Sequence, residues 1–133
     1  MKALCEKVKI LLPALLERGP VYLLALFERD DAAGKWDVVL SAAWSDADTA
    51  SAIRFVSAQL VPSLSPEELG SLSRIAIIPS TTPSISAMTS VMNITGGHTE
   101  LVDCNLMGLQ IKHAYIFRAQ RPPAQQPGMA QTV

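Results

Sequence analysis

The stretch from residue 21 to residue 44 constrains the fold more than any other part of the chain. Two strand-like runs, 21–27 and 36–44, flank a polar link at 28–35 that contains a glycine. The first run is apolar at every position, which is the pattern of a strand covered on both faces. In the second run every other side chain is apolar, so only one face is strongly hydrophobic. We therefore predict a β-hairpin whose first strand is central and whose second strand lies nearer an edge of the sheet.

Two tryptophans give this hairpin a possible role in association. Trp36 and Trp44 share the apolar face of the second strand by its alternation. If the first strand supplies the central core, the edge formed by residues 36–44 is open and one indole faces a partner. Open edges and exposed apolar patches are typical association surfaces. The sequence thus nominates Trp36 and Trp44 as interaction residues.

Composition narrows the class of protein. A chain of 133 residues is an ordinary size for one domain. Although 49% of the residues are hydrophobic, no uncharged apolar run approaches the roughly 20 residues that cross a bilayer. The net charge of −1 gives no general attraction for nucleic acid or anionic membranes. We expect a cytoplasmic protein with no nucleic-acid or membrane partner, because no signal peptide is evident and two cysteines, Cys5 and Cys104, do not resemble a secreted disulfide framework.

Helical periodicity marks the N-terminal segment and the segment after the hairpin. Apolar residues at helical spacing predict a helix between residues 4 and 16, which Pro13 is expected to divide into two. Ser45 or Asp46 is expected to cap a second helix that runs to Pro62. Its expected buried face comprises Ala50, Ile53, Ser57, Leu60 and Val61. Ser65 is expected to cap a further helix of about one turn.

The remainder of the chain alternates between strand and helix signals. Residues 72–78 predict a strand, and residues 84–94 predict a helix that ends at Gly96 and Gly97. Residues 99–105 and 109–118 predict a second hairpin with a three-residue link at 106–108. That link would place Asn105 opposite Leu109 and Asp103 opposite Ile111. The ordered domain is expected to span residues 1–120, and residues 121–133 form a Pro- and Gln-rich tail predicted to be flexible.

These elements predict an α+β domain. The order is α-β-β-α-β-α-β-β, which a five-stranded, mainly antiparallel sheet with helices packed on it satisfies. The last strand is the natural neighbour of the central first strand. At the level of architecture this order is similar to that of profilin-like domains such as the roadblock group. The resemblance implies a domain that serves dimerisation.

One short pattern resembles a nuclease motif. Asp103 is followed seven positions later by Gln110-Ile-Lys112, which loosely resembles the signature of PD-(D/E)xK nucleases. The resemblance implies a divalent metal held by acidic groups and a lysine near the attacking water. Gln110 replaces the usual acid, which weakens metal binding. The expected register also places Asp103 and Lys112 on opposite faces of the sheet unless it shifts by one residue.

Two further readings of the polar and sulfur-containing residues remain. His98, Glu100, Cys104 and Lys112 lie close in sequence, but a salt bridge between Glu100 and Lys112 explains them without a metal. Met88 and Met92, with Trp44, are candidates for the wall of a small-ligand pocket. The leading expectation is a small interaction or regulatory protein without catalytic activity, cofactor or metal, which acts as a homodimer. The alternatives are a divalent-metal nuclease and a small-ligand sensor.

Overall fold

The protein is an α+β domain built on one five-stranded sheet. The computed structural model describes residues 2–122, so the predicted tail lies almost entirely outside the described residues. The helices are α1 (Lys2–Glu17), α2 (Ala43–Ala47), α3 (Thr49–Leu60), α4 (Pro66–Ser71) and α5 (Pro83–Val91). The strands are β1 (Val21–Arg29), β2 (Trp36–Ala42), β3 (Leu72–Ile77), β4 (Thr99–Leu106) and β5 (Leu109–Ala119). This order matches the predicted one.

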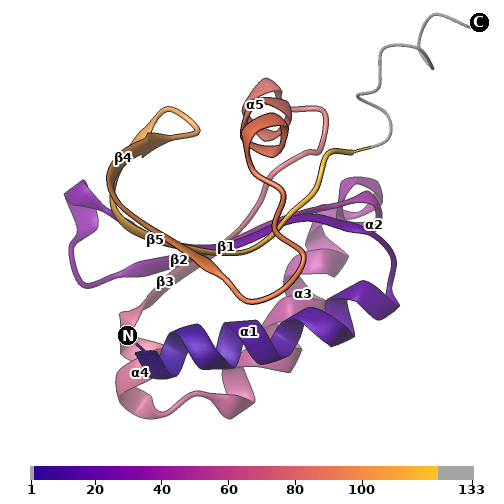
Figure 1. Ribbon diagram of the computed structural model, residues 1–133. Coiled ribbons are helices and arrows are strands. Elements are labelled where there is room, and N and C mark those ends of the chain that lie inside the picture. The colour runs from indigo at the N-terminus through magenta and orange to yellow at the C-terminus, as the bar shows by residue number, and fades with distance from the viewer. Residues whose placement is uncertain (1, 123–133) are drawn as a thin grey trace, which may run out of the picture.

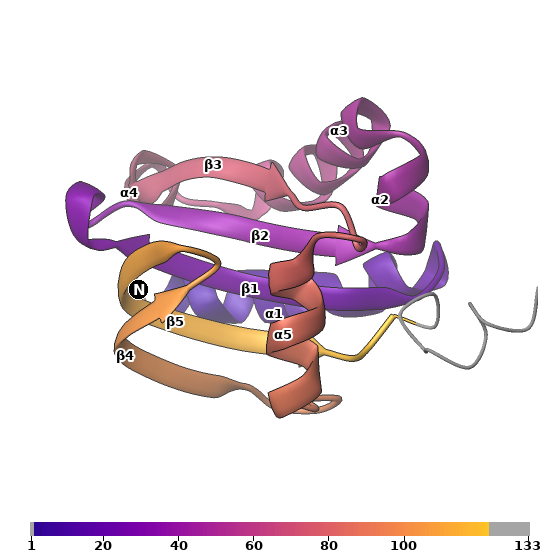
Figure 2. The same cartoon turned by 90° about the horizontal axis from the view of Figure 1, so that it is seen from above.

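The strands lie in the order β3-β2-β1-β5-β4, which Figure 2 shows from above. The central position of β1 and its pairing with β5 were both predicted, and both are confirmed. β2 and β3 run parallel, and the other neighbouring pairs are antiparallel. The prediction of an open edge at residues 36–44 is wrong, because the chain returns through α3 and lays β3 along the outer side of β2. The two edges are therefore β3 and β4.

Helices cover the two faces of the sheet unequally. Figure 1 shows α1, α3 and α4 below the sheet and α5 above it, with the β4–β5 hairpin curling up on the side of α5. We call these faces the α1 side and the α5 side. Each side has its own hydrophobic core: Leu15, Leu24 and Phe117 belong to the α1-side core, and Phe27 and Ile85 to the α5-side core.

The N-terminal helix is continuous, so the prediction that Pro13 divides it is wrong. A proline in a helix interior removes one backbone hydrogen bond. Pro13 is exposed, and water can satisfy the carbonyl left without a partner on that side. The helix therefore runs on to Glu17, and Gly19 follows with a φ of 144°.

The observed cap of α3 differs from the predicted one, whereas the observed cap of α4 agrees with the prediction. The cap of α3 is Asp48, whose Oδ1 accepts from the Ser51 N–H at 3.1 Å, rather than Ser45 or Asp46. The buried face of α3 shifts accordingly, and the expected core residue Ile53 is exposed. The residues that α3 buries are Ala52, Val56 and Leu60. Ser65 caps α4 as predicted.

The predicted helix at 84–94 is confirmed as α5, but its predicted end is wrong. The helix stops at Val91, before the two glycines, and Met92 has extended backbone angles. Ile94 then exchanges two backbone hydrogen bonds with Ala119, at 2.9 and 3.0 Å. This bridge to the end of β5 competes with further helix and draws the chain back to the sheet.

The predicted register of the second hairpin is wrong by one residue. Met107 and Gly108 have φ values of 57° and 78°, which is the signature of a two-residue hairpin turn. Leu106 therefore pairs with Leu109, and Asn105 with Gln110. Turn length sets the register, so counting one residue too many in the link moved every predicted pair.

Candidate binding groove

A buried carboxylate stands on the α5 side of the sheet. Alternation along β2 turns Asp37 toward that side, together with Val39 and Ser41. The Asp37 side chain is only 3% exposed, and its Oδ2 lies 3.1 Å from Arg29 Nε and 3.2 Å from Arg74 Nε. Its Oδ1 is buried and has no hydrogen-bond partner among residues 2–122. An unsatisfied buried acceptor costs roughly 1–3 kcal/mol, so this oxygen marks a position where a donor would be favourable.

The two arginines around Asp37 are not equivalent. Arg29 lies at the end of β1, and its Nη1 is also 3.4 Å from Asp31 Oδ1. Arg74 lies on the edge strand β3, its side chain is 53% exposed, and among residues 2–122 its ion pair is with Asp37. Asp37 thus contacts the Nε of Arg74, and about half of the Arg74 side chain stays exposed. Arg74 therefore presents a positive charge at the sheet edge.

A small apolar hollow lies beside this cluster. Its volume is about 190 Å³. β1, β2 and β3 supply the floor, the start of α5 supplies one wall, and the β4–β5 turn supplies the other. The lining residues are Phe27, Asp37, Val39, Arg74, Ala76, Ile78, Thr82, Ser84, Met107 and Leu109. We call this hollow, with Asp37 and Arg74 at its rim, the groove.

The groove opens onto the β3 edge, which has hydrogen-bonding capacity of its own. The Ile78 N–H donates to Leu40 O at 2.9 Å, so the backbone of Ile78 points inward to β2. Backbone groups along a strand alternate in direction. Those of Ile75 and Ile77 consequently point outward, away from β2. The side chains of residues 75–78 are all partly exposed.

The opposite edge differs in character. Within β4, Asp103 has a φ of 47°, a conformation that interrupts regular pairing. Glu100 and Asp103 both carry exposed carboxylates on this strand. Distorted backbone and charge are devices by which sheet edges avoid pairing with other chains. β3 is therefore the more receptive of the two edges.

The two predicted interaction residues lie away from this groove. Trp36 is 1% exposed and belongs to the α1-side core, so it is inside the molecule. Trp44 is not on β2 but in α2, where it is half-buried between Arg18 and Phe55, with a ring-centroid distance of 6.0 Å to the latter. The two indoles form no common exposed patch. The chain leaves the strand at Ala42, which ended the alternation that had joined them.

The nuclease-like residues are closer together than predicted. The observed pairs Val102 with His113 and Cys104 with Ile111 place position 103 across from position 112. The objection that Asp103 and Lys112 lie on opposite faces is therefore removed. Both are exposed, and no ion pair joins them in the part of the chain that the structure describes. No cluster of three or more His, Cys, Asp and Glu side chains suited to a metal ion occurs among residues 2–122.

The predicted salt bridge between Glu100 and Lys112 is not the one observed. Glu100 pairs with His113, not with Lys112. The His113 ring lies 4.8 Å from that of Tyr115, and His98 is exposed nearby. Burial raises the pKa of the Cys5 and Cys104 thiols, and both cysteines are free. Raised thiol pKa values keep these groups protonated and weakly nucleophilic at neutral pH.

The predicted ligand pocket does not assemble. Met88 and Met92 pack in the α5-side core, whereas Trp44 packs against the α1-side core. The sheet separates them. The helical spacing of the methionines was correct, but it indicated core packing and not a shared pocket.

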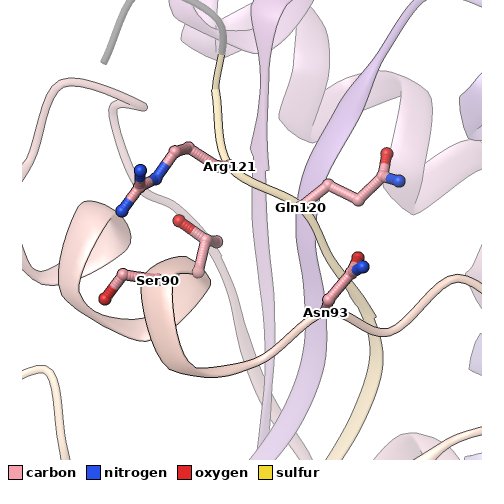
Figure 3. A pocket seen from close by; sticks show the side chains of 5 residues that line it. Ser90, Asn93, Gln120 and Arg121 are labelled. Carbon is pink, nitrogen blue, oxygen red and sulfur yellow. The ribbon is translucent and has the colours of Figure 1, made fainter. Parts of the chain in front are cut away.

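A second, more polar hollow lies where the end of α5 meets the end of β5 (Figure 3). It measures about 470 Å³, and its polar groups are largely satisfied nearby. Thr89 Oγ1 donates to Ile85 O at 2.8 Å, Ser90 Oγ to Ala87 O at 2.7 Å, and Gln120 accepts from Arg118. Figure 3 shows Asn93 and Arg121 on the two segments that flank it. Unlike the groove, this hollow contains no buried side-chain oxygen without a partner among the described residues.

Sequence reasoning missed Asp37 and Arg74. Asp37 lies on the face of β2 that alternation leaves less apolar, where a charged residue needs no explanation. Arg74 interrupts the apolar run at 72–78, and that interruption was the one available signal. Their proximity depends on the parallel pairing of Asp37 with Arg74, which joins distant parts of the chain.

No family model, no curated protein and no solved structure matches the chain. None of the helices in residues 2–122 is long and apolar enough to cross a membrane.

Proposed function

We propose that this protein is a small cytoplasmic interaction or regulatory protein that binds protein partners, acts as a homodimer and catalyses no reaction. The observation that carries the proposal is the groove, where a half-exposed arginine, an apolar hollow and an open strand edge adjoin. Such a combination suits recognition, since apolar contact supplies affinity and a few placed polar groups supply specificity. The architectural similarity to profilin-like domains supports the dimer.

A different surface favours contact between two copies. Ile10 on α1 is 71% exposed, and it borders a shallow hollow of about 180 Å³ between α1 and the end of α3. Pro13 and Ala14 extend the apolar character of this surface by one turn of helix. Val91 on α5 is even more exposed, at 79%, but its neighbours Ser90 and Asn93 are polar. Clustered apolar residues mark interfaces better than isolated ones do.

Light scattering coupled to size-exclusion chromatography tests the homodimer. We expect the unaltered protein and a Val91→Lys control to elute as dimers, and Ile10→Lys to elute as a monomer with an unchanged circular dichroism spectrum. Both substitutions put a lysine in place of a solvent-exposed aliphatic side chain, so a general effect of charge is matched. A monomeric unaltered protein at every concentration would contradict the dimer. A dimeric Ile10→Lys would exclude this surface.

A further inference from the structure

We propose that the groove binds an extended peptide segment of a partner protein, which adds to β3 as a sixth strand and places a glutamate on Arg74 and a tyrosine in the hollow. The inference rests on the proposed interaction function but not on the homodimer. It identifies the partner by the two side chains of its peptide segment that the groove would bind.

The strand edge provides the backbone part of this recognition. The outward N–H and C=O groups of Ile75 and Ile77 are available to an added strand, because Ile78 bonds inward to Leu40. In strand addition, main-chain hydrogen bonds supply affinity and alternate side chains supply specificity. Every second side chain of an added strand points to the α5 side. Two of these side chains would lie next to Arg74 and Ala76.

Charge determines the residue opposite Arg74. A cross-strand neighbour has its Cβ about 4.5–5.5 Å away, within reach of a side-chain ion pair. Asp37 Oδ2 lies 3.2 Å from Arg74 Nε, and the guanidinium nitrogens of this half-exposed side chain make no ion pair with a second residue among residues 2–122. Those nitrogens suit a carboxylate, which can accept two hydrogen bonds from one guanidinium. A lysine at this position would be repelled by the half-exposed Arg74 guanidinium.

Size and polarity determine the residue opposite Ala76. Small-molecule sites usually measure about 300–1,000 Å³, so a hollow of about 190 Å³ suits one large side chain better than a whole ligand. Phe27, Val39 and Ile78 form an apolar floor, while Asp37 Oδ1 is an acceptor without a partner. Tyrosine combines an apolar ring, which matches the floor, with a hydroxyl donor, which can bond to Asp37 Oδ1 once a shift of the Asp37 side chain exposes that buried oxygen.

Strand direction orders the two residues. Antiparallel pairs outnumber parallel ones about two- to three-fold, so we assign the added strand an antiparallel orientation. The residue opposite Ala76 then precedes the residue opposite Arg74 by two positions. The preferred sequence is Tyr-x-Glu, with β-branched residues around it to favour an extended backbone.

Fluorescence polarisation with a labelled peptide, Thr-Val-Thr-Tyr-Thr-Glu-Thr-Val, tests the inference on the full chain. We expect saturable binding that weakens about tenfold or more when Glu becomes Lys, and by up to about tenfold when Tyr becomes Phe. Both peptide changes leave the protein intact, so loss of folding cannot explain them. In the protein, Arg74→Gln should weaken binding about tenfold. Arg54→Gln, on the exposed side of α3, is the matched control and should change nothing.

Backbone hydrogen exchange then locates the peptide. We expect it to protect the amides of Ile75 and Ile77 and to leave those of β4 unchanged. Equal affinity for the Glu and Lys peptides, an unaffected Arg74→Gln variant, protection on β4, or no binding at all would each overturn the proposal. Protection of β3 that rises with protein concentration, and that the peptide cannot displace, would assign the edge to a second copy of the chain and would also overturn it. A dimer by light scattering that binds no peptide would refute this inference and leave the homodimer standing.

Discussion

Helices cover the two sides of the sheet unequally. The well-covered α1 side provides a large core, and the less covered α5 side leaves room for a binding groove. On the α1 side, α1 and α3 supply buried residues to a continuous core, and α3 and α4 have side-chain caps, from Asp48 and Ser65. On the α5 side, one helix of nine residues covers a smaller core, and its cap residue Thr82 makes no side-chain cap hydrogen bond. The space that α5 leaves uncovered is the space in which Asp37, Arg74 and the apolar hollow meet.

This difference suggests that the α1 side carries most of the folding free energy. Sites that bind partners are drawn from the less stable parts of a protein, where contacts remain unmade. The unpartnered Asp37 oxygen fits that view, because it lowers the stability of the free protein in a place where binding can recover the loss. Three sets of substitutions can break or sharpen the comparison.

Core truncation should have the largest effect, and a larger one on the α1 side. Leu15 is fully buried between α1 and the sheet, whereas Met88 retains 6% exposure beneath α5. We expect Leu15→Ala to lower the free energy of unfolding by about 4 kcal/mol and Met88→Ala by about 2 kcal/mol. Urea denaturation followed by circular dichroism measures both. Equal losses, or a larger loss for Met88→Ala, would show that α5 carries as much stability as α1.

Neutralising Asp37 should have an intermediate effect. Removing one partner of a buried ion pair can cost about 3–5 kcal/mol, but Arg74 is half-exposed and water screens it. We therefore expect Asp37→Asn to lower the free energy of unfolding by about 1–3 kcal/mol. Asp31→Asn is the control, because Asp31 also contacts Arg29 but is 74% exposed, and it should change stability by less than about 0.5 kcal/mol. Indistinguishable denaturation curves would mean that Asp37 does not organise the two arginines.

The smallest effect concerns Glu68, which links α4 to α1 on the α1 side. Its carboxylate accepts from the Ser65 N–H at 2.8 Å and pairs with Lys7 at 2.9 Å. These two contacts lower the pKa of Glu68 below its usual 4.5, the backbone hydrogen bond most strongly. Because the pKa is lower in the folded state, the stabilisation is present above pH 4.5 and disappears as the pH falls through the folded-state value.

Glu68→Gln should therefore lose little at acidic pH and somewhat more at neutral pH. Urea midpoints of the unaltered protein and the variant, measured on both sides of pH 4.5, provide the test. Glu67→Gln is a matched control, since Glu67 is the exposed neighbour in the same turn of α4. A gap between Glu68→Gln and the unaltered protein that stays constant with pH would assign the effect to something other than this carboxylate.

The sequence predicted the elements well because their signals are local. The apolar run of β1 indicated a strand covered on both faces, and β1 is the central strand with seven buried residues in succession. The Ser65 cap identified α4. The prediction at Pro13 failed because a proline's effect on a helix depends on which side faces water. The register of β4 and β5 failed because one residue in a turn determines every pair that follows.

The candidate site was much less predictable than the elements. Alternation placed Asp37 correctly on the face opposite Trp36 and Val38, yet it could not reveal that α5, β3 and the β4–β5 turn surround that face. Trp36 and Trp44 were joined by an alternation that ends at Ala42. Asp103, Gln110 and Lys112 remain an untested alternative.

The sequence by itself determined the α+β class, the order of helices and strands, and the central place of β1, because hydrophobic periodicity and capping residues act over a few neighbouring positions. Only the tertiary structure decided which strands lie at the edges and which charged side chains meet. The parallel pairing of β2 with β3 makes β3 an edge and brings Arg74 to Asp37, whose positions are 37 residues apart in the chain. Such pairings depend on how whole layers pack against one another, and no local pattern encodes them.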